Sequence, residues 1–95
     1  MEEIKANIPV FFFKEGNKVV AYSLALDLSS CGDTEEQARK RFAEAAAIFL
    51  EEIAAMGTLG EVLEECGWCA TSEKNRWSPP VYTSRSEPVR IPIGS

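Results

Sequence analysis

The residues best suited to chemistry are two cysteines three positions apart, in the run Cys66-Gly67-Trp68-Cys69. A redox pair needs a thiol of low pKa, which usually lies at a helix N-terminus. Cys66 instead falls at the predicted end of a helix, where the negative end of the helix dipole raises a thiol pKa. A zinc site needs four ligands, and the only other cysteine is Cys31. We therefore expect no metal and no cofactor, and we keep a redox or metal role as the minor alternative.

Catalysis by acid and base groups also finds little support. The chain contains no histidine, which removes the usual general base and the Ser-His and Cys-His nucleophile arrangements. Glutamates are frequent in the second half, but Glu51-Glu52 and Glu64-Glu65 are sequence neighbours, and adjacent helical residues do not face each other. We expect no catalytic residue, a solvated acidic helix face, and a protein that is not an enzyme.

Length and composition indicate one small globular domain. The chain has 95 residues, of which 45% are hydrophobic and 26% charged. The expected core covers residues 4–69, and residues 70–95 form a C-terminal strand and tail. No apolar run approaches the length of a membrane span, and the start Met1-Glu2-Glu3 lacks the basic region of a secretory signal. We expect a cytoplasmic protein without membrane contact.

The charge is acidic and uneven. The chain carries 15 acidic and 10 basic residues, a net charge of −5. Residues 34–69 hold eight acids and three bases, whereas residues 70–95 hold two acids and four bases. This balance disfavours binding of nucleic acid through a basic surface and suits a basic protein partner.

The N-terminal third has the pattern of a β-hairpin. Apolar residues alternate over 4–14 and 18–26, and Glu15-Gly16-Asn17-Lys18 supplies a turn between them. A brief third strand is expected around 29–31. Phe12 falls on the core face, while Phe11 and Phe13 fall on the opposite face. Two alternatives stay open for this second pair, namely internal cover by a C-terminal strand or an interface with a partner.

Two helices are predicted next. Thr34 is the expected N-cap of the first, with Asp33 before it and Gln37 completing a capping box. This helix runs to about residue 56 and ends at Gly57. Its apolar stripe consists of Ala38, Phe42, Ala45, Ala46, Phe49, Ile53 and Met56. Ile48 and Leu50 lie on the two flanks of the stripe, so one flank is expected to meet another element or chain.

The second helix is short, and the C-terminal region is extended. Thr58 and Glu61 repeat the capping-box pattern, and the helix ends near Cys66 and Gly67. Residues 70–80 read as a loop with a poorly formed strand around 76–77. Residues 81–82 and 89–93 are consistent with short strands, the last at a sheet edge because it contains Pro92.

The element order is therefore β-β-β-α-α-β. Strands combined with a helix layer predict an α+β two-layer sandwich. Its antiparallel sheet has three or four strands, one long helix lies on one face, and the second helix is short.

Several of these segments resemble the HicB family of small proteins, best known as antitoxins of HicA–HicB toxin–antitoxin pairs. The most specific segment is Gly32-Asp33-Thr34-Glu35-Glu36-Gln37-Ala38, which resembles the family's Gly-Asp-Thr-x-Glu-Glu-Ala signature. Ile8-Pro-Val-Phe, Val20-Ala-Tyr-Ser and Thr58-Leu59-x-Glu61-Val62-Leu63 are weaker matches. The resemblance extends over roughly residues 6–93.

The resemblance implies a partial RNase H-like fold without the nuclease carboxylates, in a single HicB-like domain over residues 1–95. Two features depart from the family pattern. A Pro-rich segment after the second strand is replaced by Leu24-Ala25-Leu26-Asp27-Leu28-Ser29-Ser30. No DNA-binding module follows the core, so direct DNA binding is not expected.

The expected function is that of a non-catalytic binding protein. The resemblance implies a type II antitoxin that neutralises a small basic HicA-type, mRNA-cleaving toxin by protein–protein contact. The alternative is an orphan HicB-like module of unknown ligand that forms a homodimer or higher homo-oligomer. The residues predicted for the partner interface are Phe11, Phe13, Ile48 and Leu50.

Overall fold

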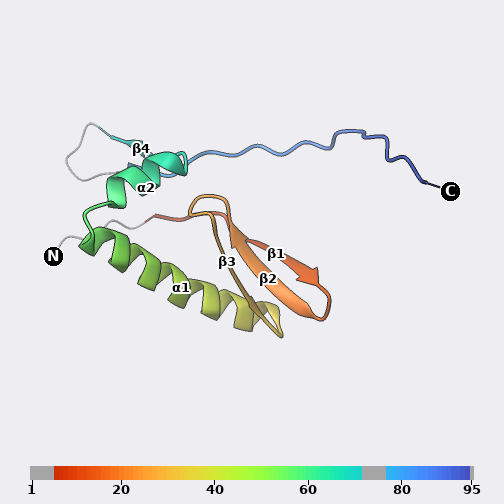
Figure 1. Cartoon of the computed structure of the whole chain (residues 1–95), viewed down its shortest axis with the longest axis horizontal. Helices are drawn as coiled ribbons and strands as arrows, with labels where there is room; N and C mark the ends of the chain where they lie inside the picture. Colours follow the sequence, from red (N-terminus) through yellow and green to blue (C-terminus); the bar gives the residue numbers. More distant parts are fainter. Residues whose placement is uncertain (1–5, 72–76, 95) are drawn as a thin grey trace.

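The computed structural model describes residues 6–71 and 77–94 of the chain. The elements are β1 (Phe11–Glu15), β2 (Lys18–Ser23), β3 (Leu28–Gly32), α1 (Glu35–Ala55), α2 (Leu59–Glu65), β4 (Cys69–Ala70) and β5 (Trp77–Ser78). The predicted α+β layout is confirmed, because a three-stranded antiparallel sheet is combined with one long and one short helix (Figure 1). Neither helix is long and apolar enough to cross a membrane within the described residues.

The sheet has the strand order β1-β2-β3, with β2 in the centre. Glu15 and Lys18 pair directly and enclose a two-residue turn, in which Gly16 has a φ of 64°. Glycine at the first central position is typical of a type II′ turn, whose twist suits a hairpin. The predicted hairpin is therefore confirmed. The first strand starts at Phe11, later than expected, and residues 4 and 5 lie outside the described residues.

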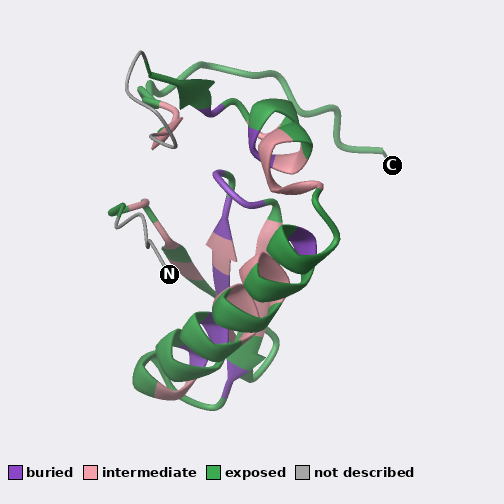
Figure 2. Cartoon of the chain, turned by 90° about the vertical axis from the view of Figure 1, so that its left-hand side faces the viewer, coloured by how far each residue is buried: buried purple, intermediate pink, exposed green. Residues whose placement is uncertain are grey.

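Helix α1 covers one face of the sheet and packs mainly on β2 and β3 (Figures 1 and 2). The contact buries Ala21 of β2 against Ala38 and Phe42 of α1. Phe12 of β1 packs at the margin of this cluster. The stripe position Met56 was predicted to be buried but is exposed, because the helix has ended at that residue and Met56 is its C-cap.

A second core cluster joins the loop between β2 and β3 to the end of α2. Ala25 and Leu26 of the loop pack with Leu63 and Trp68. The Trp68 Nε1–H donates a buried hydrogen bond of 2.7 Å to the Ala25 carbonyl oxygen. This cluster holds α2 above the end of the sheet, where Figure 1 shows it.

The N-terminus of α1 is capped as predicted. The Gln37 backbone N–H donates to Thr34 Oγ1 at 3.1 Å, and the Asp33 backbone N–H donates to Gln37 Oε1 at 2.6 Å. These bonds satisfy donors that the first helical turn leaves free.

Thr58 is the N-cap residue of α2, as predicted, and its carbonyl oxygen accepts from the Val62 N–H at 3.0 Å, but the predicted capping box is wrong. Thr58 makes no side-chain cap to α2, and its hydroxyl instead donates to the Ile53 carbonyl oxygen at 3.3 Å. Glu61 therefore lies in the first turn of α2 without a reciprocal Thr58 cap. The reason is that Thr58 belongs to the end of α1, since its backbone N–H also donates to Ile53.

Both helices end in the same motif. After α1, the N–H of Gly57 donates to Ala54 and that of Thr58 to Ile53. After α2, the N–H of Gly67 donates to Glu64 and that of Trp68 to Leu63. Gly57 and Gly67 have φ values of 77° and 94°. These are Schellman caps, and at the end of α2 the hydrophobic contact typical of the motif is the packing of Trp68 with Leu63.

The C-terminal prediction is wrong in part. Trp77 and Ser78 do form a short strand, but it pairs with β4 in a separate two-stranded sheet rather than with the main one. Residues 81–82 and 89–93 were expected to form strands, and they lie in none. They form an extended segment that leaves the body (Figure 1), because no sheet edge of the described chain lies alongside it.

Candidate functional site

The outer face of α1 presents one apolar side chain among carboxylates. Ile48, predicted as an interface residue, is 58% exposed. Glu44, Glu51 and Glu52 lie four residues before it and three and four after it, so they surround it on the helix surface. All three glutamates are exposed. We call these four residues the acidic helix face. It offers one apolar side chain that a partner can bury, surrounded by negative charge.

The negative charge continues onto α2. The chain has no lysine or arginine between Phe42 and Thr71. The same stretch holds six acids, namely Glu44, Glu51, Glu52, Glu61, Glu64 and Glu65. Because no basic side chain is interspersed, the second half of α1 and the whole of α2 carry charge of one sign. A surface of this kind steers positively charged partners toward it.

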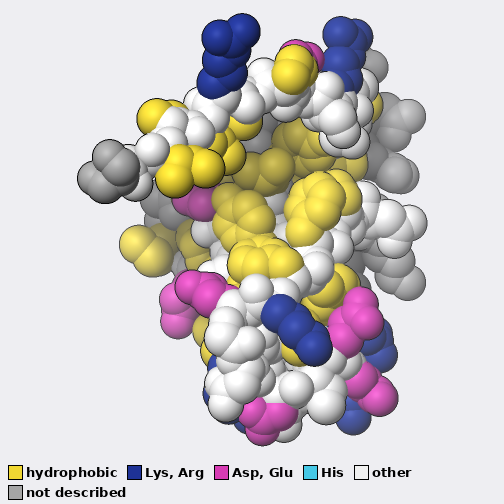
Figure 3. Space-filling view, turned by 90° about the vertical axis from the view of Figure 1, so that its right-hand side faces the viewer, with side chains coloured by type: hydrophobic (Ala, Val, Ile, Leu, Met, Phe, Trp, Pro, Cys, Tyr) yellow, Lys and Arg dark blue, Asp and Glu magenta, His cyan; other side chains and the backbone are white. Residues whose placement is uncertain are grey.

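The sheet face turned away from α1 presents aromatic residues. Phe11 and Phe13, the other predicted interface pair, are 48% and 47% exposed and sit opposite Tyr22 and Val20 of β2. Figure 3 shows hydrophobic side chains gathered in the middle of the side that carries the hairpin and the C-terminal segment in Figure 1. No helix covers this face among the described residues. It is the second exposed apolar surface.

Tyr22 closes one end of that aromatic face. Its hydroxyl donates to Asp27 Oδ1 at 3.2 Å, and Asp27 holds a left-handed backbone with φ 48°. Desolvation of the hydroxyl raises the pKa of Tyr22, and the hydrogen bond to the Asp27 carboxylate raises it further. The phenol therefore stays neutral and acts as a hydrogen-bond donor.

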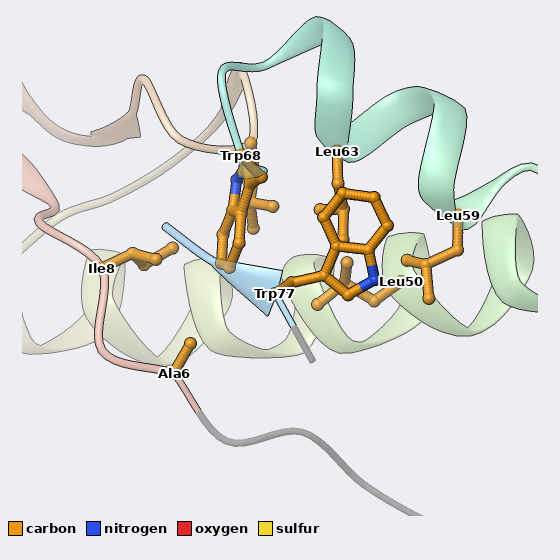
Figure 4. Close-up of a pocket in the computed structure, with 8 residues that line it drawn as sticks. Ala6, Ile8, Leu50, Leu59, Leu63, Trp68 and Trp77 are labelled. Atoms are coloured by element: carbon orange, nitrogen blue, oxygen red, sulfur yellow. The ribbon is translucent and has the colours of Figure 1, made fainter. Parts of the chain in front are cut away.

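Leu50 has a different position from Ile48. It is partly buried and lines an apolar cavity of about 270 Å³ between α1, α2 and the N-terminal segment (Figure 4). The cavity is lined by Ala6, Ile8, Leu26, Leu50, Leu59, Leu63, Trp68 and Trp77. Among the described residues no charged side chain lines it, so these walls offer no ion pair that would orient a ligand. The structure thus separates Leu50 from the exposed residues with which it was predicted to act.

Two basic residues near α1, Lys18 and Arg41, are engaged locally. Lys18 Nζ contacts Asp33 Oδ1 beside the helix N-terminus, and this lysine lowers the pKa of Asp33 through its hydrogen bond and then through its charge. The Arg41 guanidinium donates to the Cys31 carbonyl oxygen at 3.2 Å. These contacts favour a role in joining α1 to the sheet.

The three cysteines are free thiols. Cys66 is partly buried at the C-cap of α2, and burial is the main cause that raises its pKa, with the negative charges of Asp27 and Glu65 adding to it. Cys69 is exposed at the start of β4. Within residues 6–71 and 77–94, no group of three or more His, Cys, Asp or Glu side chains is placed to hold a metal ion.

Two of these features were absent from the sequence-based prediction. The ring of glutamates around Ile48 is readable from helical spacing, because residues three and four positions apart are neighbours on a helix. The cavity between Trp68 and Trp77 has no comparable local signal, since its walls come from five separate parts of the chain. Comparison with known proteins finds no family model, no curated protein and no solved structure that matches this chain.

Proposed function

We propose that this chain is a non-catalytic binding protein that resembles a type II antitoxin and neutralises a small basic, mRNA-cleaving toxin of the HicA type. Its binding surface is the acidic helix face, formed by Ile48 and the glutamates around it. The observation that carries the proposal is the exposure of Ile48, at 58%, within a stretch that has no basic residue. The resemblance to the HicB family supplies the class of partner.

Binding at the acidic helix face combines burial of an apolar side chain with electrostatic attraction of the partner. An exposed branched aliphatic side chain gains about 1.5–3 kcal/mol when a partner buries it fully. The surrounding carboxylates speed the encounter with a cationic protein and suppress binding of acidic ones. A toxin that binds RNA needs a positive surface, so the same carboxylates compete with RNA for that surface. Contact alone then inhibits cleavage, and no catalytic group is required.

The test begins with the small basic protein encoded beside this chain. The two proteins are mixed, their affinity is measured by calorimetry, and cleavage of a labelled mRNA is followed with and without the complex. We expect a stable complex that weakens as salt rises and that abolishes cleavage. Absence of binding to such a neighbour, or unimpaired cleavage within the complex, contradicts the proposal.

Matched variants locate the surface. We expect Ile48→Asp and Glu52→Lys each to weaken the complex about tenfold or more, because one removes the anchor and the other reverses a charge beside it. Glu15→Lys is the control, since it makes the same charge reversal at an exposed site in the hairpin turn. If Glu15→Lys and Glu52→Lys lost the same affinity for the partner, binding would depend on the net charge of the protein and not on the acidic helix face.

A further inference from the structure

The C-terminal segment presents aliphatic side chains without cover. Val89, Ile91 and Ile93 are 74%, 77% and 93% exposed, and Figure 2 shows the whole terminal stretch as exposed. The chain has a radius of gyration of 16.5 Å, whereas a compact domain of this length has one of about 12 Å. The excess reflects a segment that extends away from its own body (Figure 1).

The two prolines of this segment leave one of its edges able to pair. In a β-strand, the N–H and C=O groups of successive residues point alternately to the two edges. Pro88 and Pro92 are four residues apart, so their missing N–H groups fall on the same edge. Val89, Ile91 and Ile93 direct three intact N–H groups to the other edge. The segment therefore has the form of a strand that can be added to the side of a sheet.

The matching acceptor is the outer edge of β1, with which no strand pairs within residues 6–71 and 77–94. Helix α1 packs on β2 and β3, so β1 is the outer strand that it covers least. The opposite edge, β3, presents Ser29 and Ser30, whereas β1 presents phenylalanine on both of its faces. An exposed apolar edge strand is a template for pairing with another chain. In either strand direction, the aliphatic residues of an added strand would lie beside phenylalanine.

The opposite net charges of the body and of the C-terminal segment also favour their association. The described body, residues 6–71, carries eleven acids and five bases, a net charge of −6, whereas residues 77–94 carry Arg85, Arg90 and Glu87, a net charge of +1. Two surface hollows beside Phe12 are lined in part by Asp33, Glu35 and Glu36, together with Lys14 and Arg39. A positively charged strand is therefore attracted to the acidic body as a whole.

From these observations we infer that the chain forms a homodimer in which residues 89–93 of each copy add a strand to the free edge of β1 in the other copy. The segment leaves its own sheet, and reciprocal exchange of an identical element is a low-cost route to a closed dimer. The added strand covers the aliphatic side chains and the edge of β1 together. This surface is separate from the acidic helix face, so the dimer does not depend on the proposed function.

Light scattering of the 95-residue chain and of two proline variants tests the inference. We expect a mass of twice 10.5 kDa for the unaltered chain. Ile91→Pro removes an N–H from the pairing edge and is expected to give a monomer. Gly94→Pro is the matched control, because it removes an N–H from the edge where Pro88 and Pro92 already lack theirs and changes no charge, and it should stay dimeric. A monomeric unaltered chain, a dimeric Ile91→Pro or a monomeric Gly94→Pro would each overturn the inference.

Hydrogen exchange identifies the acceptor strand. The pair that closes a two-residue hairpin is hydrogen-bonded, so Phe12 and Lys14 are the β1 residues whose N–H groups point to the free edge. Their amides should exchange slowly in the dimer and at least tenfold faster in Ile91→Pro, while those of β2 stay unchanged. Protection of Phe12 and Lys14 in a monomer would show that the segment binds its own copy, and no difference between the two proteins would exclude β1. Both outcomes contradict the inference.

Discussion

The indole nitrogen of Trp68 donates a buried hydrogen bond of 2.7 Å to the carbonyl oxygen of Ala25, which lies 43 residues earlier in the chain. Ala25 belongs to the loop between β2 and β3, and Trp68 follows the Schellman cap of α2. This one bond therefore ties the end of the helical region to the end of the sheet. It also satisfies a buried carbonyl that no strand partner reaches.

Replacement of Trp68 by phenylalanine keeps an aromatic ring but removes the donor. We expect Trp68→Phe to lower the free energy of unfolding by about 1–3 kcal/mol, because the Ala25 carbonyl stays buried without a partner. Urea unfolding followed by circular dichroism measures this change. Tyr22→Phe is the control, since it removes an exposed hydrogen bond to Asp27 and should alter stability by less than about 0.5 kcal/mol. Equal effects would mean that burial of the bond is unimportant.

Phe42 is the largest side chain that α1 buries against the sheet. It is packed with Ala21 and Ala38 in the cluster between α1 and the sheet. We expect Phe42→Ala to cost about 3–5 kcal/mol of unfolding free energy. Ile48→Ala, on the outer face of the same helix, should cost no more than about 0.5 kcal/mol. A loss below about 1 kcal/mol for Phe42→Ala would mean that α1 is held by other contacts.

Gly32 permits the close approach of β3 to the first turn of α1. A Cβ atom at this position would lie 2.7 Å from the Ala38 backbone nitrogen and 3.0 Å from Gln37 Cβ. Since backbone cannot move aside at low cost, we expect Gly32→Ala to destabilise the fold by about 1–3 kcal/mol. Thermal unfolding measures the effect. Gly94→Ala, where nothing lies within 4 Å, should leave the melting temperature unchanged.

The parts of the fold that the sequence predicted well depend on local chemistry. Gly16 identified the hairpin turn, and Thr34 with Gln37 identified the start of α1. Gly57 and Gly67 identified both helix ends, because only a residue that tolerates positive φ closes a Schellman motif. In each case the interacting groups are within five residues of one another, so the pattern is visible in a short stretch of sequence.

The wrong predictions fall into two kinds. In one, a local sequence pattern fits two different structural roles; in the other, the interacting residues are far apart in the sequence. Thr58 does stand at the N-cap of α2, but its N–H and its hydroxyl both donate to the Ile53 carbonyl oxygen at the end of α1, so the hydroxyl caps no N–H of α2. Met56 continues the helical spacing by one turn beyond the last residue that packs. The hydrogen bond from Trp68 to Ala25 and the separate pairing of β4 with β5 depend on tertiary contacts that no local window contains.

The ion pair between Lys18 and Asp33 predicts a dependence on pH. The hydrogen bond from Lys18 lowers the pKa of Asp33, so the folded carboxyl loses its proton more readily than the unfolded one. Its stabilising effect is present above the unfolded pKa of about 4 and is lost as pH falls through the lower folded value. We expect Lys18→Gln to raise the pKa of Asp33 in an NMR titration. The difference in unfolding free energy between this variant and the unaltered chain should be smallest at low pH, where Asp33 is protonated in both. Lys14→Gln should leave the pKa of Asp33 unchanged.

Cys66 is predicted to be the least reactive of the three thiols. Burial raises its pKa most, and the charges of Asp27 and Glu65 raise it further, so at neutral pH less of it is the nucleophilic thiolate than in an ordinary cysteine. Iodoacetamide should therefore alkylate exposed Cys69 and Cys31 before Cys66, as followed by mass spectrometry of peptides, and the rate at Cys66 should rise only at a higher pH. The double variant Cys66→Ser and Cys69→Ser should not differ from the unaltered chain in zinc content or in melting temperature. Fastest labelling at Cys66 would instead indicate a stabilised thiolate and would favour a redox role for the pair.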